Sequence, residues 1–92
     1  MVTLANLPPE ILSTPVVDGV VQEGYIYAVD AVDPNGDPLT YRLEIAPVGM
    51  EIGAMTGIIT WMPVTPGDVA VVVRVQDGHG ATATQSYTLR AR

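Results

Sequence analysis

Three residues able to bind a metal ion lie within five positions of one another in this sequence. Asp33, Asn35 and Asp37 sit in the segment Asp33-Pro34-Asn35-Gly36-Asp37-Pro38. Carboxylate and amide oxygens are hard ligands, and an oxygen-only set of this kind suits Ca²⁺. The prolines and the glycine between them oppose a continuing strand and favour a loop. The alternative is that these aspartates only cap turns by accepting hydrogen bonds from nearby backbone amides.

The same loop mimics an EF-hand, and this interpretation is excluded. Asp33, Asn35 and Asp37 occupy alternate positions, and Glu44 stands at the twelfth. The sixth position, where an EF-hand requires glycine, is Pro38. The residues after Pro38 alternate as a strand does, which at roughly 3.3 Å per residue would place Glu44 on the order of 20 Å from Asp37.

The residues on both sides of the loop alternate between apolar and polar, which indicates two half-buried strands. In the segment before the loop, Asp30 marks the outer face. The side chains expected to face the core in the two segments are Tyr25, Tyr27, Val29 and Ala31, then Leu39, Tyr41, Leu43 and Ile45.

The rest of the chain continues this pattern and shows no helical periodicity. Residues 10–21 predict a first strand that Pro15 splits and confines to a sheet edge. Met50 and Ile52 are expected to reach the core, and Trp61 is expected to be buried because it shares the parity of Ile59. Further strands are predicted over 58–61, 69–76 and 81–90, with a glycine-rich hairpin turn at 77–80. About seven short strands with frequent turns predict an all-β, immunoglobulin-like β-sandwich, with an open barrel as the alternative.

Length and charge restrict the class of protein. The 92 residues suffice for one domain, so 1–92 is interpreted as a single module cut from a longer chain, with 1–9 as an entering linker. Ten acidic residues oppose four arginines and no lysine, giving a net charge of −6. We therefore expect no nucleic-acid partner and no anionic membrane surface. No apolar run is long enough for membrane insertion, and without cysteine no disulfide can form.

Four motifs in order resemble the cadherin-like, immunoglobulin-like repeats of bacterial surface proteins, which are related to the dystroglycan-type cadherin domain. The resemblance covers Asn6 to Leu89, and the chain departs from the usual pattern at Gly53 and at Asn35, where aspartate is common. The motifs are Gly24-Tyr25-x-Tyr27-x-Val29-x-Ala31-x-Asp33-Pro34-Asn35-Gly36-Asp37-x-Leu39-Thr40-Tyr41, Pro47-x-Gly49-Met50-x-Ile52, Thr56-Gly57-x-Ile59-x-Trp61-x-Pro63 and Val75-x-Asp77-Gly78-x-Gly80.

Such a sandwich would place the loop at 33–38, the turn at 77–80 and the N-terminal linker at one pole. The candidate metal ligands expected to converge there are Asp33, Asn35, Asp37 and Asp77, with Asn6 as a further member. The resemblance implies that this pole receives the preceding domain, with Ca²⁺ held in the junction by acids from both sides. The isolated module is expected to bind Ca²⁺ weakly and to fold without it.

The resemblance implies a non-catalytic structural or adhesive repeat of a secreted or cell-surface bacterial protein. The expected partners are neighbouring repeats of the same chain, another cell-surface protein or a polysaccharide. The alternative is an accessory carbohydrate-binding module of a secreted glycoside hydrolase, which an exposed aromatic strip would favour. The sole histidine, His79, lies between two glycines, and no nucleophile-elbow motif is present. Enzymatic activity is therefore not expected.

Overall fold

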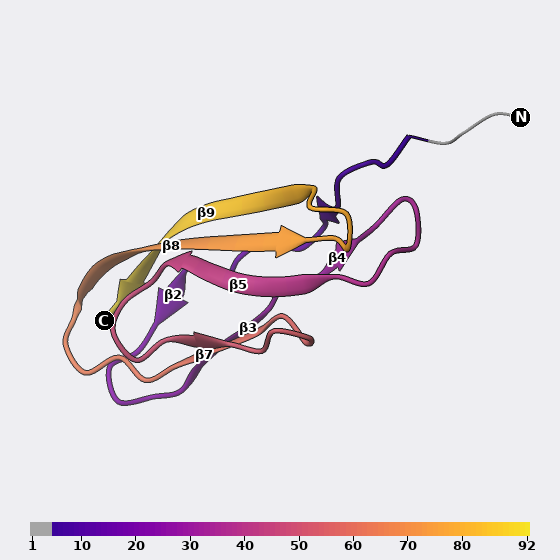
Figure 1. Cartoon of the computed structure of the whole chain (residues 1–92). Coiled ribbons are helices and arrows are strands. Elements are labelled where there is room, and N and C mark those ends of the chain that lie inside the picture. Colours follow the sequence, from indigo (N-terminus) through magenta and orange to yellow (C-terminus); the bar gives the residue numbers. More distant parts are fainter. Residues whose placement is uncertain (1–4) are drawn as a thin grey trace, which may run out of the picture.

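Nine β-strands make up the computed structural model, which describes residues 5–92 (Figure 1). The described part of the chain forms no helix and so has none that could cross a membrane. Two of the nine strands come from the split first strand. The segment predicted as one strand before the loop is also divided, into residues 25–28 and 31–32, and the strand at residues 51–52 was not predicted. The strands are β1 (Glu10–Ile11), β2 (Asp18–Gly19), β3 (Tyr25–Ala28), β4 (Ala31–Val32), β5 (Thr40–Ile45), β6 (Glu51–Ile52), β7 (Ile58–Trp61), β8 (Gly67–Gln76) and β9 (Thr82–Ala91).

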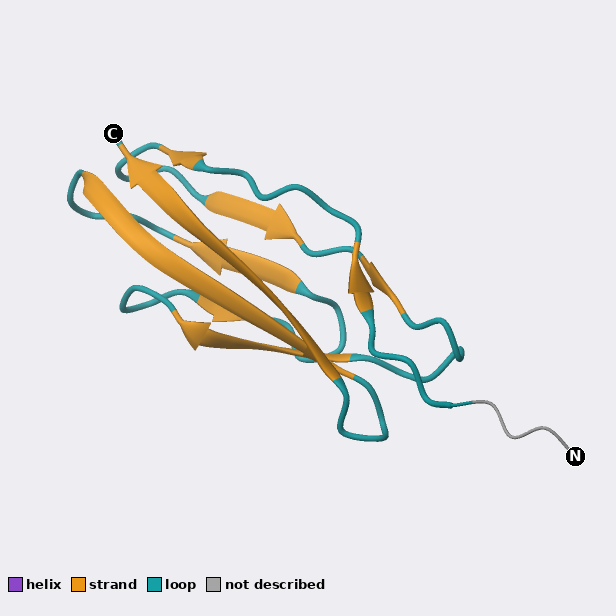
Figure 2. Cartoon of the chain, turned by 90° about the horizontal axis from the view of Figure 1, so that it is seen from above, coloured by secondary structure: helices purple, strands orange, loops and turns teal. Residues whose placement is uncertain are grey.

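The strands form two main layers that face each other. One sheet has the order β2-β9-β8-β5 and the other has the order β3-β7-β6, while β1 and β4 make a separate antiparallel pair. Figure 1 shows the long strands β8 and β9 together with β5 in one layer and β3 with β7 in the other, and Figure 2 shows the same strands from above. The predicted all-β sandwich is confirmed.

The core between the layers follows the period of two that the sequence predicts. Val71, Val73 and Val75 alternate along β8 and are completely buried. On the facing sheet the tyrosine face of β3 points inward, as predicted, while Ile26 between the tyrosines is exposed. The remaining core residues are Val29, Met50, Ile59 and Leu89. Of these, Val29 and Met50 were predicted to face the core.

Ile45 does not face the core, and the prediction that it would was wrong. Leu43 pairs with Val73, but Ile45 pairs with Val72, so β5 carries one extra residue at this point. A one-residue shift of this kind turns the following side chain to the opposite face. Ile45 is therefore 54% exposed, whereas Leu43 packs against the core.

Trp61 is only half-buried, so the prediction of a buried tryptophan needs correction. It pairs with Tyr25 at the end of β7 and packs against the core, but the next residue, Met62, has already left the sheet. The two layers open there, so part of the indole ring lines a surface groove. Ile59, two residues earlier, is completely buried.

The first strand is split between two partners, as Pro15 predicts. β1 pairs antiparallel with β4, and β2 pairs parallel with β9. Side chains hold the segment between β1 and β2: the Tyr25 hydroxyl donates to the Val16 carbonyl at 2.6 Å, and Gln85 Nε2 donates to the Ser13 carbonyl at 2.9 Å. Side-chain hydrogen bonds thus supplement the few backbone contacts of this segment where the chain changes sheets.

The molecule is a rod, with extents of 57 × 18 × 17 Å. The described N-terminal residues and the C-terminus lie at opposite ends of it (Figures 1 and 2). We call the end formed by residues 5–9, 33–38 and 77–80 the N-terminal pole. The end formed by residues 20–24, 46–49 and 62–67 with Arg92 is the C-terminal pole.

Candidate cation site at the N-terminal pole

Side-chain hydrogen bonds join three segments at the N-terminal pole. Asn6 Nδ2 donates to Asp77 Oδ2 at 2.9 Å, which ties the entering segment to the β8–β9 hairpin. The Leu7 amide donates to Asn35 Oδ1 at 2.8 Å, which ties the same segment to the 33–38 loop. The structure therefore brings the loop, the hairpin and the entering segment together.

Asp33 shapes its own loop. Its Oδ1 accepts hydrogen bonds from the Asn35 amide at 2.8 Å and the Asp37 amide at 3.2 Å. The Gly36 amide closes a turn onto the Asp33 carbonyl at 3.0 Å, with Gly36 at a φ of 75°, a conformation that favours glycine. Asp33 Oδ2 is buried and has no hydrogen-bond partner in the described chain. One oxygen of this carboxylate is thus committed to the turn, and the other accepts no hydrogen bond from the described residues.

Asp77 is the only charged residue that is buried among residues 5–92, with 4% of its surface exposed. Its Oδ1 accepts from the amides of His79 at 2.8 Å and Ala81 at 2.9 Å, and its Oδ2 accepts from Asn6. The hydrogen bond from Asn6 does most to hold the pKa of this carboxyl below its ordinary value, and the two backbone amides add to it against the opposing effect of burial. Asp77 therefore stays anionic at neutral pH.

His79 lies beside Asp37 and Asp77 at this pole, although its sequence position between two glycines predicted only the tip of a hairpin. Its Nδ1 lies 3.0 Å from Asp37 Oδ2. One ligand atom each from Asp37, Asp77 and His79 lie within 4.8 Å of one another. The sequence signal was available, because His79 stands two residues from Asp77 in the turn predicted to share this pole.

The donor set fits part of a Ca²⁺ coordination shell. Ca²⁺ takes about 6–8 oxygen ligands, and Asp37 and Asp77 each offer one oxygen to the group of ligand atoms that lie within 4.8 Å of one another. Asp33, in the adjoining loop, has an unpartnered Oδ2 but is not a member of that group. Asn35 is not turned to this group, because its side-chain amide contacts the entering segment. The EF-hand stays excluded, since Glu44 lies on β5 and accepts a hydrogen bond from Arg42 at 2.9 Å.

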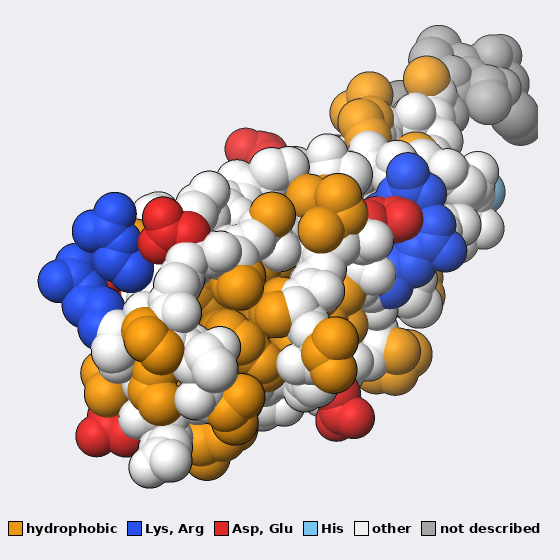
Figure 3. All heavy atoms as spheres, turned by 90° about the vertical axis from the view of Figure 1, so that its left-hand side faces the viewer, with side chains coloured by type: hydrophobic (Ala, Val, Ile, Leu, Met, Phe, Trp, Pro, Cys, Tyr) orange, Lys and Arg blue, Asp and Glu red, His pale blue; other side chains and the backbone are white. Residues whose placement is uncertain are grey.

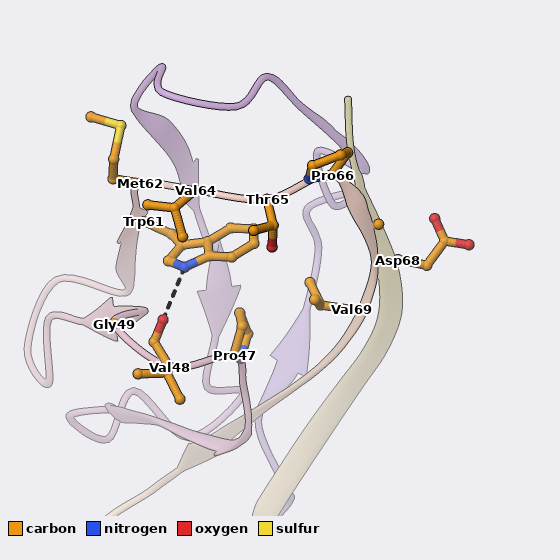
Figure 4. Close-up of a pocket in the computed structure, with 11 residues that line it drawn as sticks. Pro47, Val48, Gly49, Trp61, Met62, Val64, Thr65, Pro66, Asp68 and Val69 are labelled. Atoms are coloured by element: carbon orange, nitrogen blue, oxygen red, sulfur yellow. Dashed lines mark hydrogen bonds between the residues drawn. The ribbon is translucent and has the colours of Figure 1, made fainter.

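The C-terminal pole has a different character. A groove of about 590 Å³ opens there beside Trp61, between residues 47–49 and 61–69. Figure 3 looks onto this pole and shows hydrophobic side chains gathered across it, with arginines only at the margins. In Figure 4 the indole N–H points to the Val48 carbonyl, at 3.2 Å, and Val64 and Thr65 lie over the ring. The indole N–H of Trp61 is thus bound by the backbone, while the ring packs against the core on one side and lines the groove on the other.

No aromatic side chain among residues 5–92 is largely exposed to solvent. Tyr25 and Tyr27 are buried, and Tyr41, Tyr87 and Trp61 are partly buried against the core. The described chain therefore has no exposed aromatic strip of the kind that would favour a carbohydrate-binding module.

Known proteins resemble this chain in sequence or in fold. Integrin beta-like protein A of Dictyostelium discoideum is 30% identical over 70 residues, which are 71% of this chain and 4% of that protein. The crystal structure of a putative α-galactosidase from Bacteroides fragilis superposes on this chain with a TM-score of 0.78 at 22% identity. The match covers 99% of this chain and 19% of that chain. Human protocadherin-24 EC1-2 gives a TM-score of 0.72 at 18% identity, over 96% of this chain and 44% of that chain.

The two structural likenesses show the fold alone, and this chain spans less than half of each of these relatives. The family assignment comes from the sequence. The family model described as "Putative Ig domain" matches residues 8–92, nearly the whole chain. This chain accordingly belongs to the putative Ig domain family, and its fold is that of cadherin-like and immunoglobulin-like sandwiches.

Proposed function

We propose that this chain is a non-catalytic spacer or adhesive module that stands in series with other domains of a secreted or cell-surface bacterial protein. The observation that carries the proposal is the shape: a rod of 57 Å whose described ends leave from opposite poles (Figures 1 and 2). A module of this form extends a chain and separates its neighbours. Its partners are neighbouring modules of the same chain and, in an adhesive role, another cell-surface protein or a polysaccharide.

The relatives support this role through their size and their names. The chain matches 4% of an integrin beta-like protein and 44% of a two-repeat protocadherin fragment, so in each case a domain of this type is one part of a longer molecule. Both names are those of adhesion proteins, which supports placing the module outside the cell.

We further propose that the N-terminal pole binds Ca²⁺ weakly. Asp33, Asp37 and Asp77 would supply oxygens directly, while Asn35 contacts the entering segment instead. The missing ligands would come from a preceding module. Folding does not require the ion, because internal N–H groups already satisfy most of these oxygens in its absence.

A second candidate is an accessory module of a secreted glycoside hydrolase. The specific observation in its favour is the likeness to a domain that makes up 19% of an α-galactosidase chain. Because the aromatic side chains of residues 5–92 are buried or partly buried against the core, such a module would act beside the catalytic domain as a spacer. Affinity electrophoresis in gels containing soluble polysaccharides tests this second role, because retardation of the chain would show direct sugar binding, which a spacer in a hydrolase would not have.

Thermal unfolding in Ca²⁺, in Mg²⁺ and in chelator tests the calcium proposal. With a dissociation constant near 1 mM, about 10 mM Ca²⁺ adds roughly 1.4 kcal/mol to the free energy of unfolding. In a domain of this size, about 1 kcal/mol moves the melting temperature by about 4–8 °C. Mg²⁺ should do less, because it demands a strict octahedral geometry.

Two variants make this measurement specific. Asp37→Asn should abolish the shift that Ca²⁺ produces, since it replaces a proposed ligand. Asp68→Asn, at the C-terminal pole, should leave it unchanged. A single melting temperature in all three solutions for the unaltered chain would refute the calcium proposal for this module, and the spacer proposal would then depend on the shape alone.

A further inference from the structure

The segment that enters the domain is bound by the side chains that would hold the cation. Asn6 donates to Asp77, and Leu7 donates to Asn35. We propose that residues 5–9 form an internal cap on the N-terminal pole, which a cation must displace, so that cation binding and release of this segment are coupled. This inference rests on the proposed calcium site.

The cap is fixed along its length. Asn6 Nδ2 reaches Asp77 Oδ2 at 2.9 Å, and the Leu7 amide reaches Asn35 Oδ1 at 2.8 Å. Asn35 Nδ2 also donates back to the Ala5 carbonyl at 3.4 Å, so this one side chain contacts the segment twice. Pro9, which precedes β1, is buried. The segment is therefore anchored in the fold at one end and fastened to the pole along the rest.

The side-chain donors of the pole occupy the positions of a cation. The Asn6 amide N–H points at Asp77 Oδ2, and His79 Nδ1 makes the corresponding contact with Asp37 Oδ2 at 3.0 Å. A cation binding at either oxygen would be repelled by the positive end of these N–H dipoles. On this proposal the Asn6 amide leaves Asp77 Oδ2 before that oxygen coordinates an ion.

Coupling of this kind is reciprocal. An ion that displaces Asn6 also loosens the contacts of Leu7 and changes the direction in which the chain enters the domain. Conversely, anything that draws the segment away from the pole raises the affinity for the ion. The cap thereby relates the cation concentration to the orientation of whatever precedes the module.

The sign of the effect of Asn6→Ala distinguishes a cap from a ligand. A hydrogen bond to a charged group is strong enough to shift an equilibrium about tenfold, so removing Asn6 should tighten Ca²⁺ binding by about that factor in calorimetric titration. If Asn6 were a ligand through Oδ1, the same variant would bind more weakly. Weaker or unchanged binding overturns the cap.

Amide hydrogen exchange of Leu7 provides a second readout. In the chain without added ion, the Leu7 amide should be protected, and Asn35→Ala should remove that protection. In the unaltered chain, saturating Ca²⁺ should speed exchange at Leu7. Exchange that is unchanged or slower in Ca²⁺ overturns the cap.

A matched control lies at the C-terminal pole. Arg92→Ala removes another donor to a carboxylate, Asp18, at 3.5 Å, and should change neither Ca²⁺ affinity nor Leu7 exchange. The two proposals fail in different ways. If neither the unaltered chain nor Asn6→Ala binds Ca²⁺, the calcium site and the coupling are both wrong; if both bind equally, the site stands and only the cap is wrong.

Discussion

The two poles of this rod are built from the same kinds of loop but are held together by different forces. At the N-terminal pole, carboxylate and amide side chains are hydrogen-bonded to backbone amides and to one another. At the C-terminal pole, apolar side chains surround a half-buried tryptophan, and Val48 and Val64 are 99% and 73% exposed. The comparison teaches that the fold sets where loops meet, while the loop residues decide whether the meeting place is electrostatic or apolar.

The difference predicts how each pole responds to perturbation. Apolar packing has no ionisable group and so does not depend directly on pH; it depends on the volume and shape of side chains. Hydrogen-bonded carboxylates depend on their ionisation and on the ions in solution. Substitutions at the C-terminal pole should therefore change stability at every pH, whereas those at the N-terminal pole should change its dependence on pH and on cations.

The largest effect is expected from Trp61→Ala. Replacing a core Trp by Ala costs about 3–5 kcal/mol, and because Trp61 is half-buried we expect a loss of about 3 kcal/mol in denaturant-induced unfolding. Val48→Ser is the control, because this neighbour in the same groove is almost fully exposed and should cost less than about 0.5 kcal/mol. Equal effects from the two substitutions would mean that the C-terminal pole contributes little packing.

An intermediate effect is expected from Tyr25→Phe, which tests the hydroxyl contacts beneath the first strand. The Tyr25 hydroxyl donates to the Val16 carbonyl at 2.6 Å and lies 2.9 Å from the Tyr87 hydroxyl. Losing it should cost about 1 kcal/mol at neutral pH. Ser13→Ala, which removes the contact with the Tyr27 hydroxyl at 2.7 Å, should give a comparable loss if these contacts hold the segment independently.

Alkaline pH sharpens the test on the same tyrosine. Burial is the main cause that raises the pKa of Tyr25 and of Tyr87 above the ordinary value of 10.0. The folded chain therefore keeps protons that the unfolded chain releases, so this contribution to stability is complete below about pH 10 and is lost as the pH rises above it. The free energy of unfolding should therefore fall less steeply with rising pH in Tyr25→Phe than in the unaltered chain. Tyrosinate absorbance that appears well before unfolding would contradict this account.

The smallest effect at neutral pH is expected from Asp77→Asn, because asparagine also accepts the two backbone hydrogen bonds of the turn. The pKa of Asp77 is held below its ordinary value of 3.8, foremost by Asn6. The carboxylate therefore contributes stability that is present above about pH 4 and is lost as the pH falls through its native pKa. The stability of the unaltered chain should fall more steeply in acid than that of Asp77→Asn. Parallel acid transitions would show that this carboxylate is not stabilised by folding.

The strands and their inward faces could be predicted because alternation is a local property. Each residue of a strand points opposite to its neighbour, so Asp30, which lies between β3 and β4, was enough to predict the outer face of this segment, and the buried tyrosines followed. Pro15 predicted the split first strand through its missing N–H, which β1 and β2 confirm. The loop at 33–38 was likewise determined by its own proline and glycine.

Tertiary structure decided those side-chain orientations that the local sequence pattern cannot encode. The extra residue in β5 turned Ile45 outward only because β8 offers it a shifted partner, and Trp61 is half-exposed because the two layers open where β7 ends. Asp77 is buried and hydrogen-bonded by Asn6, 71 positions away, and His79 meets Asp37 across 42 positions. The residue types of the candidate site could thus be read from the sequence, but the direction of each side chain depends on distant partners that only the folded chain brings within reach.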